Sequence, residues 1–238
     1  SGTHGAYVRL IKGDAECIIV AREPSPDELK AAEEAGVELD VRPCARDAFV
    51  FITNTKNPVD SLTQDQIRSI YAGKTKTWRE LGGDAETRDG QIVAYTRNRN
   101  SGSQELMVDL VMKDTKFAMP DRERLLMGMG GPIDMVAGQE NALAYSVYYY
   151  ERFMNRNPQV KLLAVDGVKP SYETIADGSY PLTTKVYAVV RKDTAADSRA
   201  VEFRDWLKNT NEGQWTVRLS GYVPWHLEPQ TAGSAAPR

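Results

Sequence analysis

Apolar residues fall in short runs along the chain, separated by segments with helical spacing. Residues 17–20, and residues 48–52 within the strand predicted at 47–53, are continuous apolar runs, which is typical of strands buried on both faces of a sheet. Similar runs lie at residues 91–95, 142–147, 160–165 and 185–190. Strands that alternate with helices predict an α/β protein and favour mostly parallel sheets.

Two of the intervening helices carry complete start signals. Ser25 suits the N-cap position, Pro26 suits the first helical position, and Glu28 closes a capping box. Thr63 and Gln66 form a second capping box ahead of an amphipathic run. We therefore expect helices to begin after Ser25 and after Thr63.

No apolar run approaches the ~20 residues that a membrane-spanning helix needs. The chain has no internal repeat and no Gly/Ser-rich linker, so we expect its lobes to be joined by strands that cross between them. Residues 228–238 form a low-complexity tail, which we expect to be disordered. The sequence shows no signal segment, which is expected equally of a mature chain and of a trimmed one.

Charge and histidine content exclude several classes of protein. Thirty basic and 33 acidic residues give a net charge of −3 without a clustered basic stripe, so we expect no nucleic-acid partner. The two histidines, His4 and His226, are too few and too far apart for a zinc site or a Ser-His-Asp mechanism. We expect neither a metal nor a cofactor.

The two cysteines, Cys17 and Cys44, fit neither a zinc spacing nor a Cys-x-x-Cys redox motif. Each lies in or beside a predicted strand, where two buried free thiols are one interpretation. A disulfide between them is the other interpretation, and it would require an oxidising compartment.

The segment at residues 95–104 is the strongest candidate for a binding site. It follows a predicted strand and opens a predicted helix, where the first backbone N–H groups lack partners and the helix dipole is positive. Gly102 permits close approach of the backbone, and Ser101 and Ser103 offer hydroxyls. Arg97 offers a bidentate guanidinium. Together these groups suit a tetrahedral oxyanion.

This segment has a second interpretation. Ser101 and Gln104 have the spacing of a capping box, and capping alone would explain both residues. Another stretch of small and hydroxylated residues, at 1–7, precedes a helical run and contains Thr3. That stretch is either a frayed terminus or a second anion-binding loop. The two loops would form a strong site only if they faced each other.

Many short stretches match a known family in their order and spacing. They are residues 13–19, 47–52, 57–59, 62–63, 70–74, 78, 81–83, 97, 101–103, 170–175, 178–182, 212–214 and 221–224. With these stretches the chain resembles the phosphate-binding proteins of bacterial ABC importers, a group of type II periplasmic binding proteins. The resemblance implies an α/β, two-lobed type II periplasmic-binding-protein fold with two crossing strands. Lobe I would comprise residues 1–91 and 184–227, and lobe II residues 92–183.

In this family an Arg, and a Ser-Gly-Thr that begins four residues later, contact phosphate from the second lobe. These positions are held here by Arg97, Ser101, Gly102 and Ser103. The serine that replaces the family's threonine keeps the hydroxyl. Thr3 matches a hydroxyl residue at the head of a first-lobe helix. The resemblance therefore implies that these residues bind phosphate.

The chain departs from the family pattern in two places. Just before the stretch matched by Glu23 and Pro24, the family usually has an acidic residue that accepts a proton from the ligand, and Arg22 stands there instead. Arg22 would favour a fully ionised phosphate or another oxyanion, unless Glu23 substitutes as the acceptor. The family also begins with one more strand, a Gly-Ser loop and a helix. We expect a preceding segment, or strand exchange with another copy, to cover that edge.

The resemblance implies a non-enzymatic, extracytoplasmic solute-binding protein that captures inorganic phosphate between two lobes. Its partners would be the membrane subunits of an ABC importer, and it would be periplasmic or a cell-surface lipoprotein. The alternative is a surface or sensory relative that binds another oxyanion or has lost tight phosphate binding. An enzyme with Ser101 or Ser103 as nucleophile would lack a nearby base.

Overall fold

A computed structural model describes residues 2–82, 90–99, 101–118 and 124–226. Residue contacts divide the chain into two compact units. Unit 1 comprises residues 1–5 and 47–185, and unit 2 comprises residues 6–46 and 186–238. Within the described ranges, no helix is long and apolar enough to cross a membrane.

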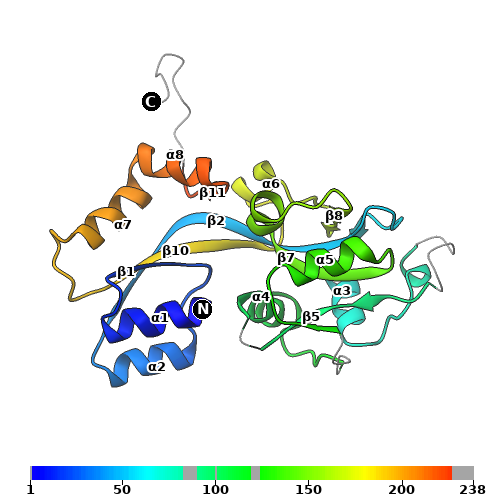
Figure 1. Ribbon diagram of the computed structural model, residues 1–238, viewed down its shortest axis with the longest axis horizontal. Helices are drawn as coiled ribbons and strands as arrows, with labels where there is room; N and C mark the ends of the chain where they lie inside the picture. Colours follow the sequence, from blue (N-terminus) through cyan, green and yellow to red (C-terminus); the bar gives the residue numbers. More distant parts are fainter. Residues whose placement is uncertain (1, 83–89, 100, 119–123, 227–238) are drawn as a thin grey trace, which may run out of the picture. The chain divides into compact units, whose positions relative to one another are not determined.

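Two long strands carry the chain from one unit to the other (Figure 1). They are β2 (Leu39–Asn54) and β10 (Thr183–Arg191). Each strand contributes residues to both units, and the two are neighbours in the main sheet. The two crossing strands that the family resemblance implies are therefore present.

The second half of β2 is the central strand of unit 1. It pairs antiparallel with β7 (Ala142–Val147) and with β8 (Val160–Leu162). β4 (Val93–Ala94) pairs parallel with the other side of β7. Two short parallel pairs complete the strands that the structure describes in this unit: β3 (Ser61–Leu62) with β9 (Ala164–Val165), and β5 (Thr96–Arg97) with β6 (Leu125–Leu126).

Helices cover the strands of unit 1, and α5 packs on β7 (Figure 1). They are α3 (Gln64–Tyr71), the 3₁₀ turn η1 (Arg79–Leu81), α4 (Gly102–Leu106), the π-helix η2 (Met107–Met112), α5 (Gly131–Gly138), the π-helix η4 (Tyr150–Met154) and α6 (Tyr172–Ala176). The core beneath them is aromatic. Phe49, Phe51, Tyr71 and Tyr145 are buried with ring centroids 5.4 to 6.3 Å apart, within the range of favourable aromatic pairs.

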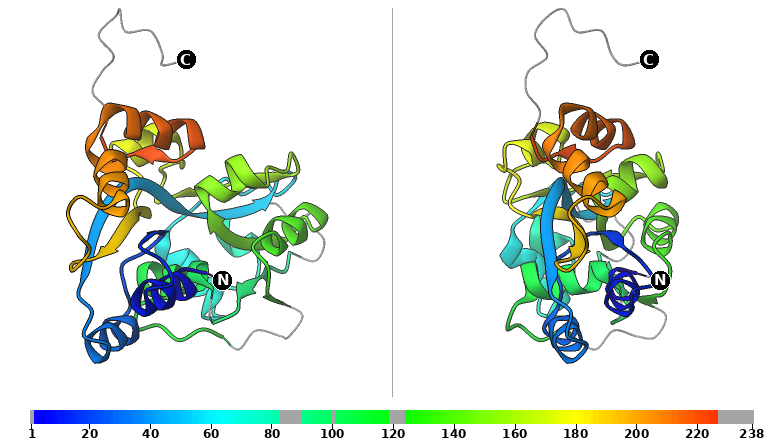
Figure 2. Two further views of the ribbon diagram at one scale, coloured as in Figure 1. Left: turned by 60° about the vertical axis from the view of Figure 1, so that its left-hand side comes forward. Right: turned by 90° about the vertical axis from the view of Figure 1, so that its left-hand side faces the viewer.

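Unit 2 is a sheet with helices on both faces. Its other strands are β1 (Cys17–Val20), antiparallel to β10, and β11 (Val223–Pro224), antiparallel to β2. Its helices are α1 (Thr3–Lys12), whose first residues count with unit 1, α2 (Pro26–Glu34), α7 (Arg199–Asn209) and α8 (Asn211–Ser220). Alternate residues of β10 face opposite sides, as expected of a strand. Tyr187 packs with Tyr7 of α1, whereas Val186 packs with Leu207 and Val217. The last two come from α7 and α8, which adjoin each other (Figure 2).

The expectation of mostly parallel sheets is wrong for the main sheet. β2 pairs antiparallel with β7, β8 and β11, and β1 pairs antiparallel with β10. Alternation of strands and helices predicts parallel pairing only where successive strands become neighbours through a crossover. Here β2 takes these partners from segments that follow much later in the chain.

The two units differ from the expected lobes at residues 1–5, 47–91 and 184–185, which were expected in lobe I and lie in unit 1. Residues 47–91 are expected in lobe I, whereas residue contacts group them with residues 92–183. The difference arises at β2, because this strand runs without a break and its second half pairs with β7 and β8 of unit 1. The lobe boundaries, as the parts that would close around a ligand, stay a prediction. The tail at 228–238 lies outside the described residues.

The local predictions agree closely with the structure where caps define an element. Both capping boxes are present, with Glu28 N donating to Ser25 Oγ and Gln66 N donating to Thr63 Oγ1. Both cysteines are free thiols, Cys44 buried and Cys17 half-buried. The interpretation as free thiols is therefore confirmed and the disulfide is not formed.

Asp47 is a buried carboxylate at the point where β2 enters unit 1. Its Oδ1 accepts hydrogen bonds from the backbone N–H groups of Ala48 and Tyr149, at 2.8 and 3.0 Å. Burial raises its pKa to about 6, and the two hydrogen bonds oppose that rise. The folded protein therefore holds a proton here at pH values where the unfolded chain has lost it.

This raised pKa predicts a specific pH dependence of stability. Protonation of Asp47 favours the folded state below pH 4, and that contribution is lost as the pH rises to about 6. A shift of about two pKa units corresponds to about 3 kcal/mol. Asp47→Asn keeps the Oδ1 acceptor but has no group to titrate. As the pH rises from 4 to 7, its free energy of unfolding in urea should therefore increase relative to that of the wild type by up to this amount. The exposed Asp109→Asn is the control, and an equal pH response of both variants would contradict the assignment.

Candidate functional site

Arg97 is the centre of the candidate site, and β5 holds it in a buried position of unit 1. Its side chain is 7% exposed. Its backbone N–H donates to the hydroxyl of Tyr145 at 2.9 Å and to Oε1 of Gln104 at 3.2 Å. Its guanidinium Nη2 donates to the carbonyl of Met127 at 3.3 Å. The residue is thus fixed by its backbone, while most of its guanidinium donors have no hydrogen-bond partner among the described residues.

The electrostatics of Arg97 would suit an anionic partner. Within the described ranges it forms no ion pair with a carboxylate, and its Nε is buried without a hydrogen-bond acceptor. Burial lowers its pKa, but an arginine starts so high that the group stays charged. A buried charge without a counter-ion is costly, and such a cost is typical of sites that bind a ligand of opposite charge.

The hydroxyls of Ser101 and Ser103 lie at the start of α4, four and six residues after Arg97. Ser101 is the N-cap residue with an extended backbone, but its side chain makes no capping hydrogen bond. Instead the two hydroxyl oxygens are 2.9 Å apart and share one hydrogen bond. The side chain of Ser101 therefore does not cap the first turn of α4.

The capping-box interpretation of Ser101 and Gln104 is wrong. The Gln104 carbonyl oxygen does not turn back to the N-cap; it accepts from the Arg97 backbone and from the Tyr145 hydroxyl. The buried Tyr145 hydroxyl needs a partner, and Gln104 supplies it. A tertiary contact that the spacing does not reveal has replaced the local one.

A matched pair of cap substitutions tests this difference. We expect Ser25→Ala to lower the free energy of unfolding by about 1 kcal/mol, because it removes the side-chain half of a formed capping box. Ser101→Ala should change it by less than about 0.5 kcal/mol, because the Ser101 hydroxyl caps nothing. Thermal unfolding of both variants measures this difference in stability. Equal losses of stability would show that Ser101 does cap α4.

Thr3 and Gly102 lie near each other in unit 1. Thr3 Oγ1 is 4.0 Å from the point that a Cβ on Gly102 would occupy, and no closer atom of the protein crowds that point. Gly102 has no positive φ either. Neither backbone conformation nor crowding by the described residues thus requires a glycine here, and its missing side chain leaves room for close approach to the backbone. Ser1, the first residue of the same stretch, lies outside the described residues.

Arg22 lies in unit 2, and its guanidinium is already paired. Nη1 and Nη2 donate to the two carboxylate oxygens of Glu28 at 2.7 and 3.0 Å, and Nη1 also donates to the carbonyl of Glu23. Glu28 lies in the first turn of α2 and is 2% exposed, so this ion pair is largely shielded from solvent. The Glu23 carboxylate accepts from the hydroxyl of Tyr187 at 2.7 Å. Arg22 as a phosphate ligand stays a prediction.

The chain matches a known family over most of its length. A profile described as the PBP superfamily domain matches residues 1–209. The chain belongs to this family. The phosphate-binding protein PstS of Staphylococcus saprophyticus is 27% identical over 214 residues, covering 87% of this chain and 64% of that protein. PstS of Bacillus subtilis is 26% identical over 198 residues, covering 82% and 61%. This member of the family thus spans less than two thirds of the length of these two relatives.

Solved structures agree with the family assignment. A putative phosphate ABC transporter substrate-binding protein with bound phosphate, from Clostridium perfringens, has a TM-score of 0.76 and 27% identity. The match covers 94% of this chain and 85% of that one. An ABC-type phosphate transport receptor from Vibrio cholerae, at 22% identity, shares the fold with a TM-score of 0.71 over 93% of this chain and 85% of that one. The α/β fold of the type II periplasmic binding proteins, as the sequence predicts, is confirmed.

Two residues that hold Arg97 in place, Tyr145 and Gln104, were not predicted from the sequence to do so. Tyr145 lies in the strand predicted at residues 142–147 and was assigned no part in the site, but it is 1% exposed and its hydroxyl accepts from the backbone N–H of Arg97. Gln104 lies in the candidate segment, but its spacing suggested only a cap. An apolar run such as residues 142–147 that contains one tyrosine could have indicated a buried hydroxyl in need of a polar partner.

Proposed function

We propose that this chain is an extracytoplasmic solute-binding protein that captures inorganic phosphate for an ABC importer. The observation that carries the proposal is Arg97, a buried guanidinium without a carboxylate partner in the described structure, beside an uncapped helix start with two hydroxyls. Relatives named as phosphate-binding proteins, and a similar structure described with bound phosphate, support the choice of anion.

Each group of the site has a definite part in binding. The Arg97 guanidinium donates two hydrogen bonds to one edge of the anion and balances its charge. The backbone N–H groups at Gly102 and Ser103 and the two serine hydroxyls replace water on the other side. Thr3, near Gly102, adds a further hydroxyl. The proposed role is capture without a chemical step.

The serine hydroxyls would also allow the site to discriminate phosphate from sulfate, although position 22 lacks an acidic hydrogen-bond acceptor. A hydroxyl accepts a hydrogen bond as well as donating one. Phosphate carries a proton near neutral pH and can donate it to Ser101 or Ser103, whereas sulfate has no proton to donate. Because Arg22 is paired with Glu28, the site would not depend on Arg22 to choose between the two anions.

Isothermal titration of the chain with phosphate, and separately with sulfate, tests the proposed function. We expect phosphate to bind with a dissociation constant in the micromolar range or tighter, and sulfate to bind at least about 100-fold more weakly. Equal binding of both anions would favour the alternative, a relative that takes another oxyanion. Binding of neither would leave the family and fold in place and remove the proposed function.

Three finer features extend the proposal. The membrane subunits of the importer would receive the ligand, and a lipid anchor would hold the protein at the cell surface.

The third feature concerns β1, which is the last strand at one end of the main sheet and carries Ile19 with 45% of its surface exposed. A strand from a second copy would pair with this edge. Sedimentation at two protein concentrations tests that exchange, and a monomer at both would exclude it.

A further inference from the structure

Gln104 connects the two parts of the candidate phosphate site. Arg97 lies on β5, whereas Gln104 lies in the first turn of α4, next to Ser103. Oε1 of Gln104 accepts from the backbone N–H of Arg97 at 3.2 Å and from the hydroxyl of Tyr145. One side chain thus joins the strand that carries the guanidinium to the helix start that carries the serine hydroxyls.

Tyr145 completes a closed set of hydrogen bonds with these two residues. Its hydroxyl donates its one proton to Gln104 and accepts from the Arg97 N–H at 2.9 Å. That N–H is therefore shared between two acceptors. Tyr145 is 1% exposed, so a shift of α4 relative to β5 would leave a buried hydroxyl without its acceptor, which is costly. The arrangement therefore resists such a shift.

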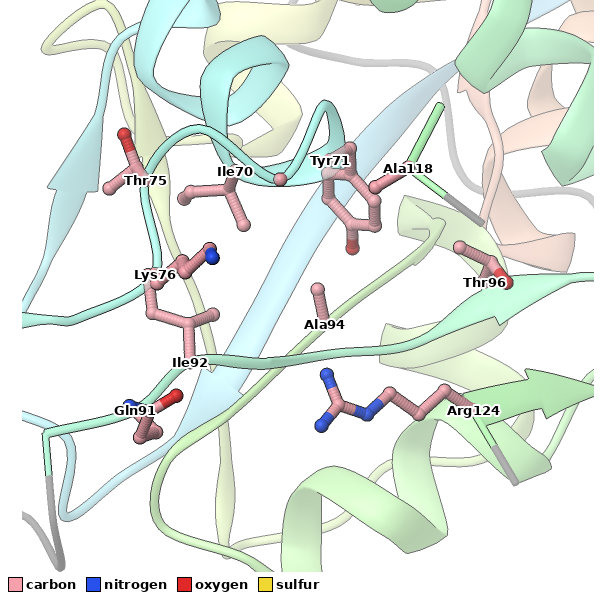
Figure 3. A pocket seen from close by; sticks show the side chains of 11 residues that line it. Ile70, Tyr71, Thr75, Lys76, Gln91, Ile92, Ala94, Thr96, Ala118 and Arg124 are labelled. Atoms are coloured by element: carbon pink, nitrogen blue, oxygen red, sulfur yellow. The ribbon is translucent and has the colours of Figure 1, made fainter. Parts of the chain in front are cut away.

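The core of unit 1 holds the partners of Gln104 in place. The ring of Tyr145 packs against that of Tyr71, with centroids 5.7 Å apart. Tyr71 also donates to the carbonyl of Tyr95, which directly precedes β5, at 3.2 Å. Figure 3 shows the Tyr71 hydroxyl directed toward the segment that leads into β5. The core thus fixes both β5 and Tyr145, and Gln104 fixes α4 relative to them.

The amide of Gln104 has one defined orientation. The backbone N–H of Arg97 can only donate, so the end of the amide that faces it must be the carbonyl oxygen, and the NH₂ group is the other end. That NH₂ group has no hydrogen-bond partner in the described part of the chain. The contacts of the fold therefore require an acceptor at this position and do not require the nitrogen.

Glutamate at position 104 would satisfy these contacts as well as glutamine does. A carboxylate accepts the same two hydrogen bonds, and a negative charge in the first turn of a helix is favourable. The two side chains differ in their effect on a bound anion. A carboxylate here would repel an anion at the same helix start and would offer a counter-ion to Arg97. A neutral acceptor therefore suits an anion site, whereas the fold does not discriminate between the two side chains.

We propose that Gln104 is a positioning residue of the anion site: it sets the distance between Arg97 and the start of α4 without adding negative charge. This inference rests on the proposed function, and it assigns a role to the neutrality of the side chain as well as to its hydrogen bonds. Loss of the acceptor would loosen the two parts of the site from each other. A carboxylate would keep the two parts together and repel the ligand.

Two substitutions separate the hydrogen bonds from the charge. Gln104→Met has a similar length but neither acceptor nor charge, and isothermal titration should show phosphate binding weakened by about tenfold. Gln104→Glu keeps the acceptor and adds a charge, and phosphate binding should weaken by at least about tenfold through repulsion. In ¹⁵N spectra of the ligand-free chain, the backbone amide signal of Arg97 should move strongly in the Met variant and little in the Glu variant. Thermal unfolding shows whether each variant has folded.

Gln139→Glu is the matched control. Oε1 of Gln139 likewise accepts from a tyrosine hydroxyl, that of Tyr95, at 2.8 Å. Among the described residues, its side chain makes no hydrogen bond to Arg97 or to α4. This variant should leave phosphate affinity within about threefold of the wild type.

The outcomes separate this inference from the proposed function. If the wild type binds phosphate and Gln104→Glu binds as well as the control variant, the role of neutrality is overturned while the proposed function stands. Unchanged phosphate affinity in Gln104→Met would likewise overturn the positioning role alone. A wild-type chain that binds no phosphate would remove the proposed function and this inference together.

Discussion

Replacing Arg97 by alanine is expected to weaken phosphate binding by at least about 100-fold. Truncating one partner of a buried, charge-assisted pair typically costs 2 to 5 kcal/mol, because the other charge is left without compensation. The guanidinium is buried in the described structure without a competing carboxylate, so the anion would be its main partner. The phosphate affinity of Arg97→Lys should lie between those of the wild type and the alanine variant, because an ammonium keeps the charge but cannot donate two parallel hydrogen bonds.

Stability separates this role from a structural one. Arg97→Ala removes a buried and uncompensated charge, so the ligand-free variant should unfold at the same temperature as wild type or higher. The exposed Arg99→Ala, in the same loop, should leave phosphate affinity within about threefold. Calorimetry and thermal unfolding of the three proteins measure both effects. A large loss of stability with unchanged affinity would assign Arg97 to the fold instead.

Gly213→Ala is expected to lower the free energy of unfolding by about 3 kcal/mol or more. Gly213 lies in the first turn of α8, and its N–H donates to the Thr210 cap. A Cβ there would be 2.2 Å from the carbonyl oxygen of Trp206 and 2.8 Å from Cα of Leu207. Both obstacles are backbone atoms of α7, so neither can move aside as a side chain would. The helices must separate, which opens the packing around Leu207 and Val217.

The matched control for this variant is Gly138→Ala, at the end of α5. No atom lies within 4 Å of the Cβ that it would add. It should change the free energy of unfolding by less than about 0.5 kcal/mol. For a chain of this size the Gly213 variant should lower Tm by about 6 to 12 °C. A loss below about 1 kcal/mol would show that the contact between α7 and α8 is looser than the structure describes.

Local chemistry explains which elements could be predicted from the sequence. The helices after Ser25 and Thr63 were predictable because their caps are contacts within four residues. The start of β2 was not predicted, because charged residues such as Asp40 and Arg42 interrupt any apolar run there. In the structure Arg204 of α7 donates to Asp40 at 2.6 Å, and Arg42 donates to it at 2.8 Å. That stretch is stabilised by contacts with segments far along the chain, namely these ion pairs with α7 and the pairing of Ala45 and Arg46 with β11.

The candidate site divides in the same way. Arg97 and the two serines could be selected from the sequence because their spacing matches a family and their chemistry suits an oxyanion. The role of Gln104 could not, because it depends on Tyr145, which is 41 residues away. The pairing of Arg22 with Glu28 was hidden for another reason. Glu28 has the spacing of a capping residue, and a carboxylate with two oxygens can fill both roles.

The most direct test of the account is to locate phosphate on the chain by NMR. Phosphate titrated into ¹⁵N-labelled protein should shift the backbone amides of Gly102 and Ser103 and the Nε–H signal of Arg97, with one common dissociation constant. Sulfate at the same concentrations should shift them far less. Saturable binding that leaves these three signals unmoved, or that moves only residues elsewhere, would contradict the central claim that the start of α4 and Arg97 form the anion site.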